Sequence, residues 1–349
     1  MENQNQEEIM SFNQDGQNVP SDQSRHTIPL RDFGFLVLSS AFLVILVSYP
    51  VLPEGKLGNL PGQRQTVLAV TAIESPKKEY INPFSLVDIK AESAFVLDVT
   101  NNKILFSKSE SKRLPLASLT KIMTAITALS LAPENETVKI LPEFLTPLGD
   151  TGFFVNESWD LKTLLDITLV SSSNDGAYAI AGTIGSRELG TSDYKEGRKE
   201  FLRRMNEMAE EIGLTETYFL NETGLDETDT VSGGYGSAHD MAHLFSYALK
   251  SHPDIFRQTS HTSLKVESLD GLIHTVDNTN TAINGIPRLI SSKTGFTDLA
   301  GGNLVVAIDA GFDRPIVIVV LGSTAKERFD DVEELSWAAI ESLNEPEQN

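Results

Sequence analysis

Apolar residues are distributed along the chain in two different ways. Residues 33–53 carry no charge, and a helix of that length can cross a hydrocarbon core about 30 Å thick. This run predicts one transmembrane helix. A buried core helix is the weaker interpretation, because the flanking segments offer nothing to cover it. A cleaved signal peptide is also disfavoured, because no small-x-small pair closely follows the run.

The segments on either side of this run lack a hydrophobic pattern. Residues 1–32 are rich in Gln, Asn, Ser and acidic side chains, which bury too little apolar surface to offset the entropy of the chain. We expect a disordered tail there. Residues 54–85 mix Gly, Pro, Gln and charged residues, a composition typical of a linker.

From residue 86 onward the pattern is globular. Strand-like runs at 94–99 and 103–107 flank a turn at Asn101 and Asn102. Residues 119–131 are almost entirely apolar or Thr, which predicts a helix buried on all sides. Further helices are predicted over 160–170, 177–184, 197–212, 238–249 and 332–343, and further strands over 288–292, 303–310 and 315–321.

The order of these elements indicates the fold class. Two early strands, a helical middle, three late strands and a final helix predict an α/β (α+β layered) domain over residues 86–345. Its sheet should join both ends of the globular region. The region is long enough for one large hydrophobic core.

Composition narrows the possible functions. The chain has 349 residues, with 49 acidic against 28 basic side chains, a formal net charge of −21 and no Cys. A chain with this net negative charge and no Lys/Arg-rich block would repel a polyphosphate. We therefore expect no nucleic-acid partner. The lack of Cys excludes disulfides, thiolate metal sites and a Cys nucleophile. An enzyme of this composition must use Ser, Thr, Lys, a carboxylate or an activated water.

Ser118 and Lys121 form the first candidate catalytic pair. Residues three apart at the start of a helix share a face, which brings the lysine amine within reach of the serine hydroxyl. A serine needs a base to become a nucleophile, and burial makes the neutral form of a lysine accessible. The same spacing recurs elsewhere, for example at Ser192 and Lys195, but only Ser118 opens an apolar helix.

Two further polar motifs follow along the chain. Ser172 and Asn174 lie at a break between two predicted helices, where they could face a cleft or simply form a polar turn. Lys293-Thr294-Gly295 ends a predicted strand, where a cation and a hydroxyl could hold a carboxylate and Gly would let a substrate backbone approach. Ser-x-x-Lys, Ser-x-Asn and Lys-Thr-Gly, in this order, are the signature of penicillin-binding proteins and serine β-lactamases.

With these motifs, residues 85–335 resemble the D-alanyl-D-alanine carboxypeptidases, the low-molecular-mass penicillin-binding proteins. Flanking sequence extends the resemblance at 115–124, 169–175, 221–225, 237–242 and 293–301. It implies a β-lactamase/penicillin-binding transpeptidase-like domain, with an antiparallel sheet flanked by helices and a helical subdomain. It also implies an enzyme that removes the terminal D-Ala from peptidoglycan stem pentapeptides, needs no metal or cofactor, and is acylated by β-lactam antibiotics.

The resemblance assigns catalytic roles to four side chains. It implies that Ser118 is the acylated nucleophile and that Lys121 is its general base. Ser172 would relay a proton to the leaving amine. Asn174 would bind the peptide group of the substrate.

The resemblance also assigns substrate-binding positions around the Lys-Thr-Gly motif. Lys293 would support the electrostatic field around both hydroxyls, and Thr294 and Thr297 would contact the terminal carboxylate. The backbone N–H groups of Ser118 and Phe296 would form an oxyanion hole aimed at the developing negative oxygen.

Some positions depart from the family pattern or stay unassigned. Ser173 stands where the family often has Gly, and Phe296 where it often has His, which bears on rate and inhibitor affinity more than on mechanism. Arg328 is the nearest candidate for an arginine that helps to hold the substrate carboxylate. His239 and His243 have a spacing that can bind zinc, but the intervening Asp-Met-Ala does not match a metalloprotease motif, so we predict no metal site.

Three other functions stay open at this point. A serine β-lactamase would share the acylation step, although no convincing glutamate motif for a deacylating water follows Asn174. A DD-endopeptidase would cut cross-links with the same residues, and a non-catalytic peptidoglycan or β-lactam sensor would bind without turnover. Because peptidoglycan lies outside the cytoplasmic membrane, the resemblance implies a single-pass membrane protein with residues 1–32 inside and 54–349 outside.

Overall fold

The computed structural model describes residues 81–145, 148, 151–311 and 313–344. The tail predicted at 1–32, the transmembrane helix predicted at 33–53 and most of the linker predicted at 54–85 lie outside these ranges. Within the described ranges, no helix is both long and apolar enough to cross a membrane.

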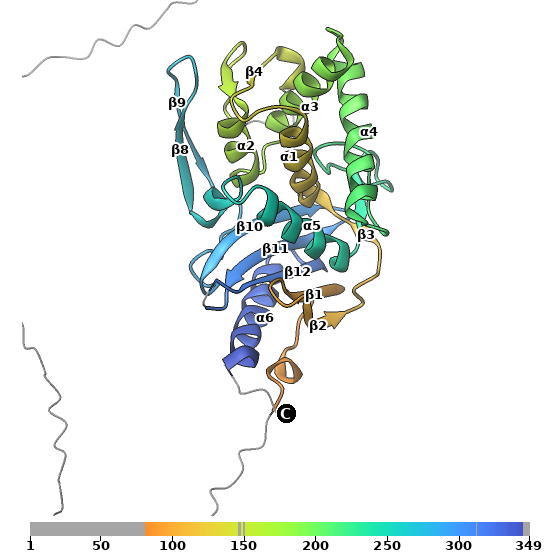
Figure 1. Ribbon diagram of the computed structural model, residues 1–349, viewed down its shortest axis with the longest axis vertical. Helices are drawn as coiled ribbons and strands as arrows, with labels where there is room; N and C mark the ends of the chain where they lie inside the picture. The colour runs from red at the N-terminus through yellow and green to blue at the C-terminus, as the bar shows by residue number, and fades with distance from the viewer. Residues whose placement is uncertain (1–80, 146–147, 149–150, 312, 345–349) are drawn as a thin grey trace, which may run out of the picture. The chain divides into compact units, whose positions relative to one another are not determined.

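A five-stranded antiparallel sheet lies at the centre of the described part (Figure 1). From one edge to the other its strands are β10 (Leu289–Thr297), β11 (Gly301–Asp309), β12 (Pro315–Ser323), β1 (Ser93–Asp98) and β2 (Lys103–Lys108). Early β1 pairs with late β12, and Phe95 lies opposite Val319. The sheet therefore joins both ends of the globular region, as the sequence predicts.

Both faces of this sheet are buried, because successive residues of its central strands point into different cores. Ile318 and Val320 of β12 belong to the smaller core, while Val317 and Val319 belong to the larger one. The smaller core is covered by η1 (Pro83–Leu86) and α6 (Glu327–Asn344), and the larger one by α5 (Ala238–Ser251) together with the helical region. Figure 1 shows α5 and α6 on opposite faces of the sheet.

The helical region lies beside the sheet and carries the candidate site. Its helices are α1 (Thr120–Leu131), preceded by η2 (Ala117–Leu119), α2 (Leu161–Val170), α3 (Asn174–Leu189) and α4 (Tyr194–Ile212). The first nine residues of α1 are all buried, which confirms a helix covered on all sides. This is why a polar side chain on α1 is withdrawn from water.

Local sequence signals set the ends of these helices. Asp160 accepts a hydrogen bond from Thr163 N over 2.9 Å and caps α2, as expected for an acidic N-cap. Gly213 follows α4 with φ of 84°, the left-handed conformation of a glycine C-cap.

Several boundaries differ from the prediction, and two of these differences concern the candidate site. Helix α3 begins at Asn174 rather than at residue 177, because Ser173 caps it one turn earlier than the apolar pattern shows. Strand β10 continues through Lys293 to Thr297 instead of ending before Lys293, because pairing with β11 extends to Thr297 opposite Gly301.

Several short elements escaped prediction. Most of them have two to four residues, too few to show a periodic pattern. They are β3 (Leu114–Pro115), β4 (Thr137–Lys139), η3 (Pro142–Phe144), β5 (Ser158–Asp160), β6 (Tyr218–Phe219), β7 (Gly234–Gly236), η4 (Arg257–Ser260), β8 (Ser263–Glu267) and β9 (Ile273–Asp277).

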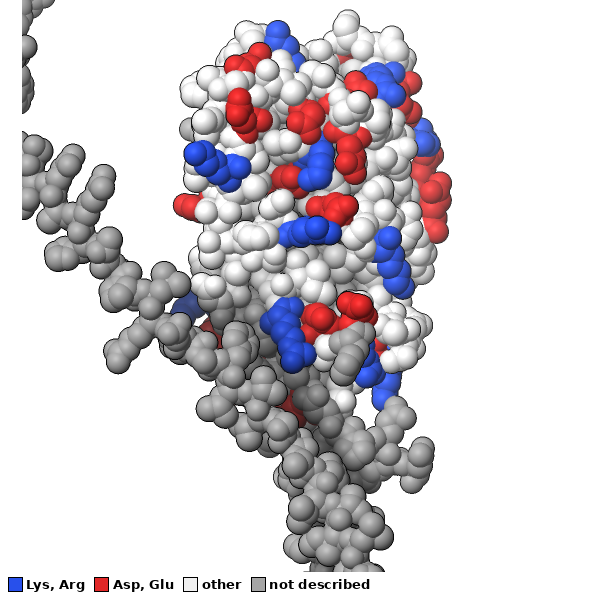
Figure 2. Space-filling view, turned by 60° about the vertical axis from the view of Figure 1, so that its left-hand side comes forward, with Lys and Arg blue, Asp and Glu red and all other residues white. Residues whose placement is uncertain are grey.

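Charges of both signs are interspersed on the surface. On the face shown in Figure 2, the described Lys and Arg side chains alternate with Asp and Glu and form no continuous basic patch. This distribution, together with the net charge of −21, gives a polyphosphate little electrostatic attraction on that face.

Candidate active site

Ser118 and Lys121 meet at the junction of η2 and α1. Lys121 Nζ donates a hydrogen bond to Ser118 Oγ over 3.0 Å, so the predicted pairing of the two side chains is confirmed. Ala117, directly before Ser118, has φ of 48°, a left-handed conformation that a non-glycine residue adopts at a cost. The turn therefore presents Ser118 at the start of a helix that buries Lys121 completely.

Lys121 Nζ has three polar partners. Besides Ser118 Oγ, it donates to Asn174 Oδ1 over 2.8 Å and to Thr223 O over 2.7 Å. Burial lowers the pKa of Lys121 to about 7, and the negative charge of Glu222 opposes part of that shift. The amine therefore exchanges its proton near neutral pH, unlike an exposed lysine.

Lys293 and Ser172 form a second amine–hydroxyl pair. Lys293 Nζ donates to Ser172 Oγ over 2.8 Å and to Thr294 O over 2.8 Å. Burial, with the charges of Lys121 and Arg328, lowers the pKa of Lys293 well below its usual value. Ser172 has φ of 61°, so this hydroxyl also sits on a strained turn, between α2 and α3.

Asn174 is held from both ends of its amide. Its Oδ1 accepts from Lys121, and its Nδ2 donates to Leu148 O over 2.8 Å. The neighbouring Ser173 is buried, and its Oγ accepts from Gly176 N over 3.0 Å and from Thr151 Oγ1 over 2.6 Å. The departure from Gly at position 173 is thus explained by capping of α3.

Strand β10 passes very close to the segment that carries the nucleophile. A Cβ added at Gly295 would lie 2.9 Å from Leu116 O and 3.3 Å from Ser118 N, so only glycine fits without a shift. Arg328 NH1 donates to Gly295 O over 2.6 Å. Arg328 is 9% exposed, and through this hydrogen bond it supports β10.

The remaining predicted substrate-binding side chains lie along the same strand. Thr294 Oγ1 shares a 2.5 Å hydrogen bond with Thr279 Oγ1. Thr297 Oγ1 donates to Asp226 Oδ1 over 3.0 Å, so its hydroxyl hydrogen is engaged with that carboxylate. Phe296 is 51% exposed and lines, with Thr297, a cavity of about 460 Å³.

The two histidines whose spacing could bind zinc contact each other. His239 and His243 lie on α5 with ring centroids 4.3 Å apart, and His239 Nδ1 is 3.2 Å from Asp240 Oδ1. Within the described ranges, no group of three or more potential metal ligands occurs.

The sequence did not predict the contact between Lys121 and the 221–225 segment. The 221–225 segment contributes to the resemblance, but the contact is made by the backbone carbonyl of Thr223, which any residue type can supply. Glu222 and its partner Arg198 lie 24 residues apart in the chain and belong to none of the three catalytic motifs.

The two hydroxyl–amine pairs, with Asn174 bonded to Lys121 of the first pair, form a site suited to acyl transfer. A serine is placed against a base of near-neutral pKa, and a second hydroxyl against a second buried amine.

Curated relatives share the globular part. D-alanyl-D-alanine carboxypeptidase DacF of Bacillus subtilis is 31% identical over 246 residues, a match that covers 68% of this chain and 59% of that protein. D-alanyl-D-alanine endopeptidase of Escherichia coli is 28% identical over 247 residues, covering 68% of this chain and 73% of that protein. The match thus spans less than two thirds of the length of the Bacillus protein.

Solved structures share the fold. The Streptomyces K15 DD-transpeptidase aligns with a TM-score of 0.64 and 24% identity over 72% of this chain and 98% of that one. Penicillin-binding protein D2 of Listeria monocytogenes, in its ampicillin-bound form, aligns with a TM-score of 0.59 and 26% identity over 72% of this chain and 97% of that one. The penicillin-binding α+β fold is therefore shown. The sequence model of the peptidase S11 family, described as D-alanyl-D-alanine carboxypeptidase, matches residues 77–325, and the chain belongs to this family.

Proposed function

We propose that this protein is a serine D-Ala-D-Ala carboxypeptidase that removes the terminal D-Ala from peptidoglycan stem pentapeptides. The observation that carries the proposal is the convergence of two hydroxyl–amine pairs, Ser118 with Lys121 and Ser172 with Lys293. Family membership and the relatives named carboxypeptidases support the same reaction.

Acylation begins with proton transfer from Ser118 to Lys121. A neutral amine has two N–H groups and one lone pair. Lys121 can therefore donate to Asn174 Oδ1 and Thr223 O while its lone pair receives the hydroxyl hydrogen of Ser118. With a pKa of about 7, much of the amine is in this basic form at neutral pH.

Ser118 Oγ then attacks the carbonyl carbon of the penultimate D-Ala, and the oxygen of that carbonyl becomes negative. The backbone N–H groups of Ser118 and Phe296 are our candidates for stabilising it, and the close approach of Gly295 to Ser118 N supports this assignment. The C–N bond breaks as Ser172, held by Lys293, passes its hydroxyl proton to the leaving amine of D-Ala. Ser172 regains a proton from the Lys121 ammonium, which leaves Lys121 neutral before deacylation.

Deacylation repeats these steps with water. Water adds to the ester carbonyl, Lys121 takes its proton, and Ser118 leaves with a proton restored. Asn174 binds the peptide group of the substrate in this scheme, and Thr294 with the charge of Lys293 receives the terminal carboxylate. Thr297 contributes by holding the end of β10 through Asp226.

A DD-endopeptidase is the second candidate, because relatives with 28% identity carry that name. Both activities would use the same acyl-enzyme, and the substrate distinguishes them. Release of one alanine from a pentapeptide muropeptide supports the carboxypeptidase. Cleavage of a cross-linked dimer without that release would assign the endopeptidase.

The remaining chain suggests an anchor for the enzyme. We place residues 1–32 in the cytoplasm, a single membrane helix at 33–53, a linker at 54–85 and the catalytic domain outside the membrane, since peptidoglycan is found there. The uncharged run at 33–53 supports this topology. Protease added to intact spheroplasts should degrade the catalytic domain, and its protection would refute the orientation.

Covalent labelling tests the enzymatic proposal directly. Mass spectrometry of the full-length chain incubated with a penicillin should show a single adduct that is lost in Ser118→Ala. Ser192→Ala is the matched control, because Ser192 and Lys195 have the same spacing on an exposed surface. An adduct that persists in Ser118→Ala would refute the assignment.

A further inference from the structure

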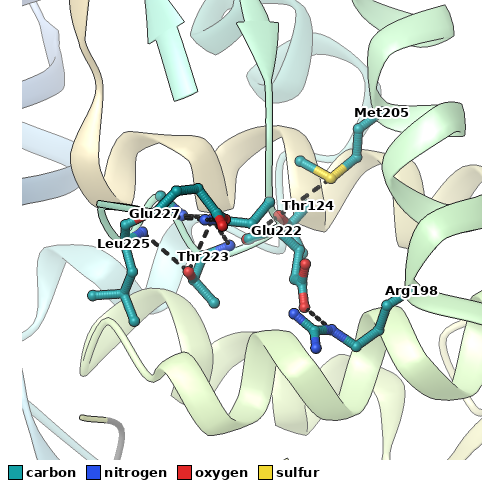
Figure 3. Close-up of polar contacts among 9 residues, drawn as sticks. Thr124, Arg198, Met205, Glu222, Thr223, Leu225 and Glu227 are labelled. Carbon is teal, nitrogen blue, oxygen red and sulfur yellow. Dashed lines mark hydrogen bonds and ion pairs between the residues drawn. The ribbon is translucent and has the colours of Figure 1, made fainter. Parts of the chain in front are cut away.

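Glu222 is a buried acidic residue that the reaction above does not use. Its side chain is 3% exposed and pairs with Nε of Arg198 on α4 (Figure 3). The guanidinium carbon of Arg198 lies 4.0 Å from the centroid of the Tyr178 ring on α3. Burying a carboxylate is costly without such a partner, so this pair needs an explanation.

The backbone beside Glu222 is tied to the helix that carries the catalytic pair. Thr124 Oγ1 donates to Glu222 O over 2.6 Å, and Lys121 Nζ donates to the next carbonyl, Thr223 O, over 2.7 Å. Lys121 and Thr124 share one face of α1, three residues apart. Two adjacent carbonyls thus bind two side chains on one face of the helix, and one of these side chains is the amine of the proposed base.

The loop that supplies these carbonyls is itself rigidly held. Asn221 Oδ1 accepts from Thr223 N over 3.1 Å and from Gly224 N over 2.7 Å (Figure 3). Gly224 has φ of 80°, and a Cβ there would lie 1.8 Å from Ala117 O. The loop therefore packs against the residue that precedes the nucleophile, and only glycine permits this approach.

We propose that Glu222 is a positioning residue for Lys121. Arg198 fixes the loop through the Glu222 carboxylate, and the loop fixes the direction of the Lys121 amine. The negative charge of Glu222 stabilises the ammonium that forms when Ser118 gives up its proton. This inference rests on the proposed acyl-transfer function and adds residues outside the three catalytic motifs.

The charges around Lys121 agree with this role. Glu222 opposes the burial that lowers the pKa of Lys121 to about 7. On the side of β10, Lys293 is buried and its pKa is lowered in part by Lys121, so the two amines repel each other when both are protonated. Loss of the Glu222 charge would leave that repulsion without the opposing carboxylate.

Arg198 is the neighbouring side chain that favours the charged form of Glu222. Burial raises the pKa of Glu222, and Glu227 on the same loop adds to the rise, while Arg198 acts in the opposite direction. The Tyr178 ring beneath Arg198 holds the guanidinium in place. Removing Arg198 should therefore neutralise Glu222 and have the same effect on Lys121 as removing the carboxylate.

The test is the pH dependence of acylation. The full-length chain in detergent is mixed with a fluorescent penicillin under single-turnover conditions across a pH series, and rates are normalised to the stoichiometry of labelling. We expect the acidic limb of the wild-type profile to lie near the pKa of Lys121, about 7. In Glu222→Gln the limb should move to lower pH by roughly 0.5–1 unit, and the plateau rate should fall about 3- to 10-fold because the base is weaker.

Matched variants separate this role from a structural one. Glu200→Gln, which breaks an Arg–Glu pair on the same helix, should leave the limb unchanged. Arg198→Ala should shift it as Glu222→Gln does, the double variant should match Glu222→Gln alone, and Arg198→Lys should keep the wild-type limb. A Glu222→Gln or Arg198→Ala protein that labels stoichiometrically with an unshifted limb would overturn the inference. Failure of the wild-type chain to acylate at any pH would overturn the proposed function itself.

Discussion

Lys293 Nζ donates a hydrogen bond to Ser172 Oγ over 2.8 Å, although 121 residues separate the two in the chain. Ser172 sits on a strained turn between α2 and α3, and Lys293 lies inside β10. The contact therefore joins the helical region to the sheet. It also places the second hydroxyl of the site against an amine whose pKa is lowered by burial.

Removing this amine should abolish most of the activity without loss of the fold. Lys293→Met keeps the length of the side chain but cannot support Ser172 or attract a carboxylate. We expect the rate of acylation by a penicillin to fall about 10²- to 10⁴-fold. Thermal unfolding should change little, because the variant no longer buries an ammonium group.

The control for that substitution is Lys265→Met, which removes an exposed amine from β8. Its acylation rate should equal that of the wild type. A Lys293→Met protein that acylates as fast as this control would show that Lys293 has no part in the reaction.

The buried amine of Lys121 should make folding stability depend on pH. Its pKa is about 7 in the folded protein and about 10.4 in an unfolded chain. Between these values the unfolded chain binds more protons than the folded one, so the free energy of unfolding rises with pH. The stability of the wild type relative to Lys121→Met should therefore increase by about 1–3 kcal/mol from pH 7 to pH 9.

Urea unfolding at the two pH values, followed by the fluorescence of the buried Trp159, measures this difference. Lys139→Met is the comparison, since that lysine is exposed on β4 and should give the same difference at both pH values. A relative stability of Lys121→Met that does not change with pH would show that Lys121 stays protonated in the folded protein.

The sequence predicts those parts of the molecule whose signal is local. The all-apolar α1, the strands that form β1 and β12, and the glycine after α4 each carry a pattern within their own residues. The three motifs likewise identify Ser118 and Lys293, because the proposed chemistry requires these residue types. The interpretation of 33–53 as a membrane helix stays a prediction.

Features that depend on a distant partner could not be predicted. Strand β10 continues to Thr297 only because β11 pairs with it. The third contact of Lys121 is to the backbone carbonyl of Thr223. Every residue type has such a carbonyl, so the sequence does not indicate this contact. The pairing of Glu222 with Arg198 needs α4 to lie beside the loop, which follows from tertiary packing alone.

Asp331 should be essential for stability and irrelevant to the chemistry. Its carboxylate accepts hydrogen bonds from Lys90 N over 2.7 Å, Ala91 N over 2.8 Å and Ser323 Oγ over 2.7 Å, which ties α6 to the segment before β1 and to the end of β12. Asp331→Ala leaves these donors unpaired and should lower the free energy of unfolding by about 2–4 kcal/mol.

Chemical unfolding measures that loss, and Asp330→Ala, at the exposed neighbouring position, should cost far less. The acylation rate per labelled molecule should be unchanged in both variants. Equal stability of the two proteins would contradict the role of the Asp331 hydrogen bonds.

Gly295 should be required for the geometry of the oxyanion hole. In Gly295→Ala the new Cβ would lie 2.9 Å from Leu116 O and 3.3 Å from Ser118 N, so β10 and the nucleophile segment must move apart. The N–H groups of Ser118 and Phe296 would then no longer converge on one oxygen, and acylation should slow by about 10²- to 10³-fold. Ile290→Ala, on the same strand but outside the motif, should acylate normally. A normal rate in Gly295→Ala would mean that the two N–H groups do not act together on the substrate.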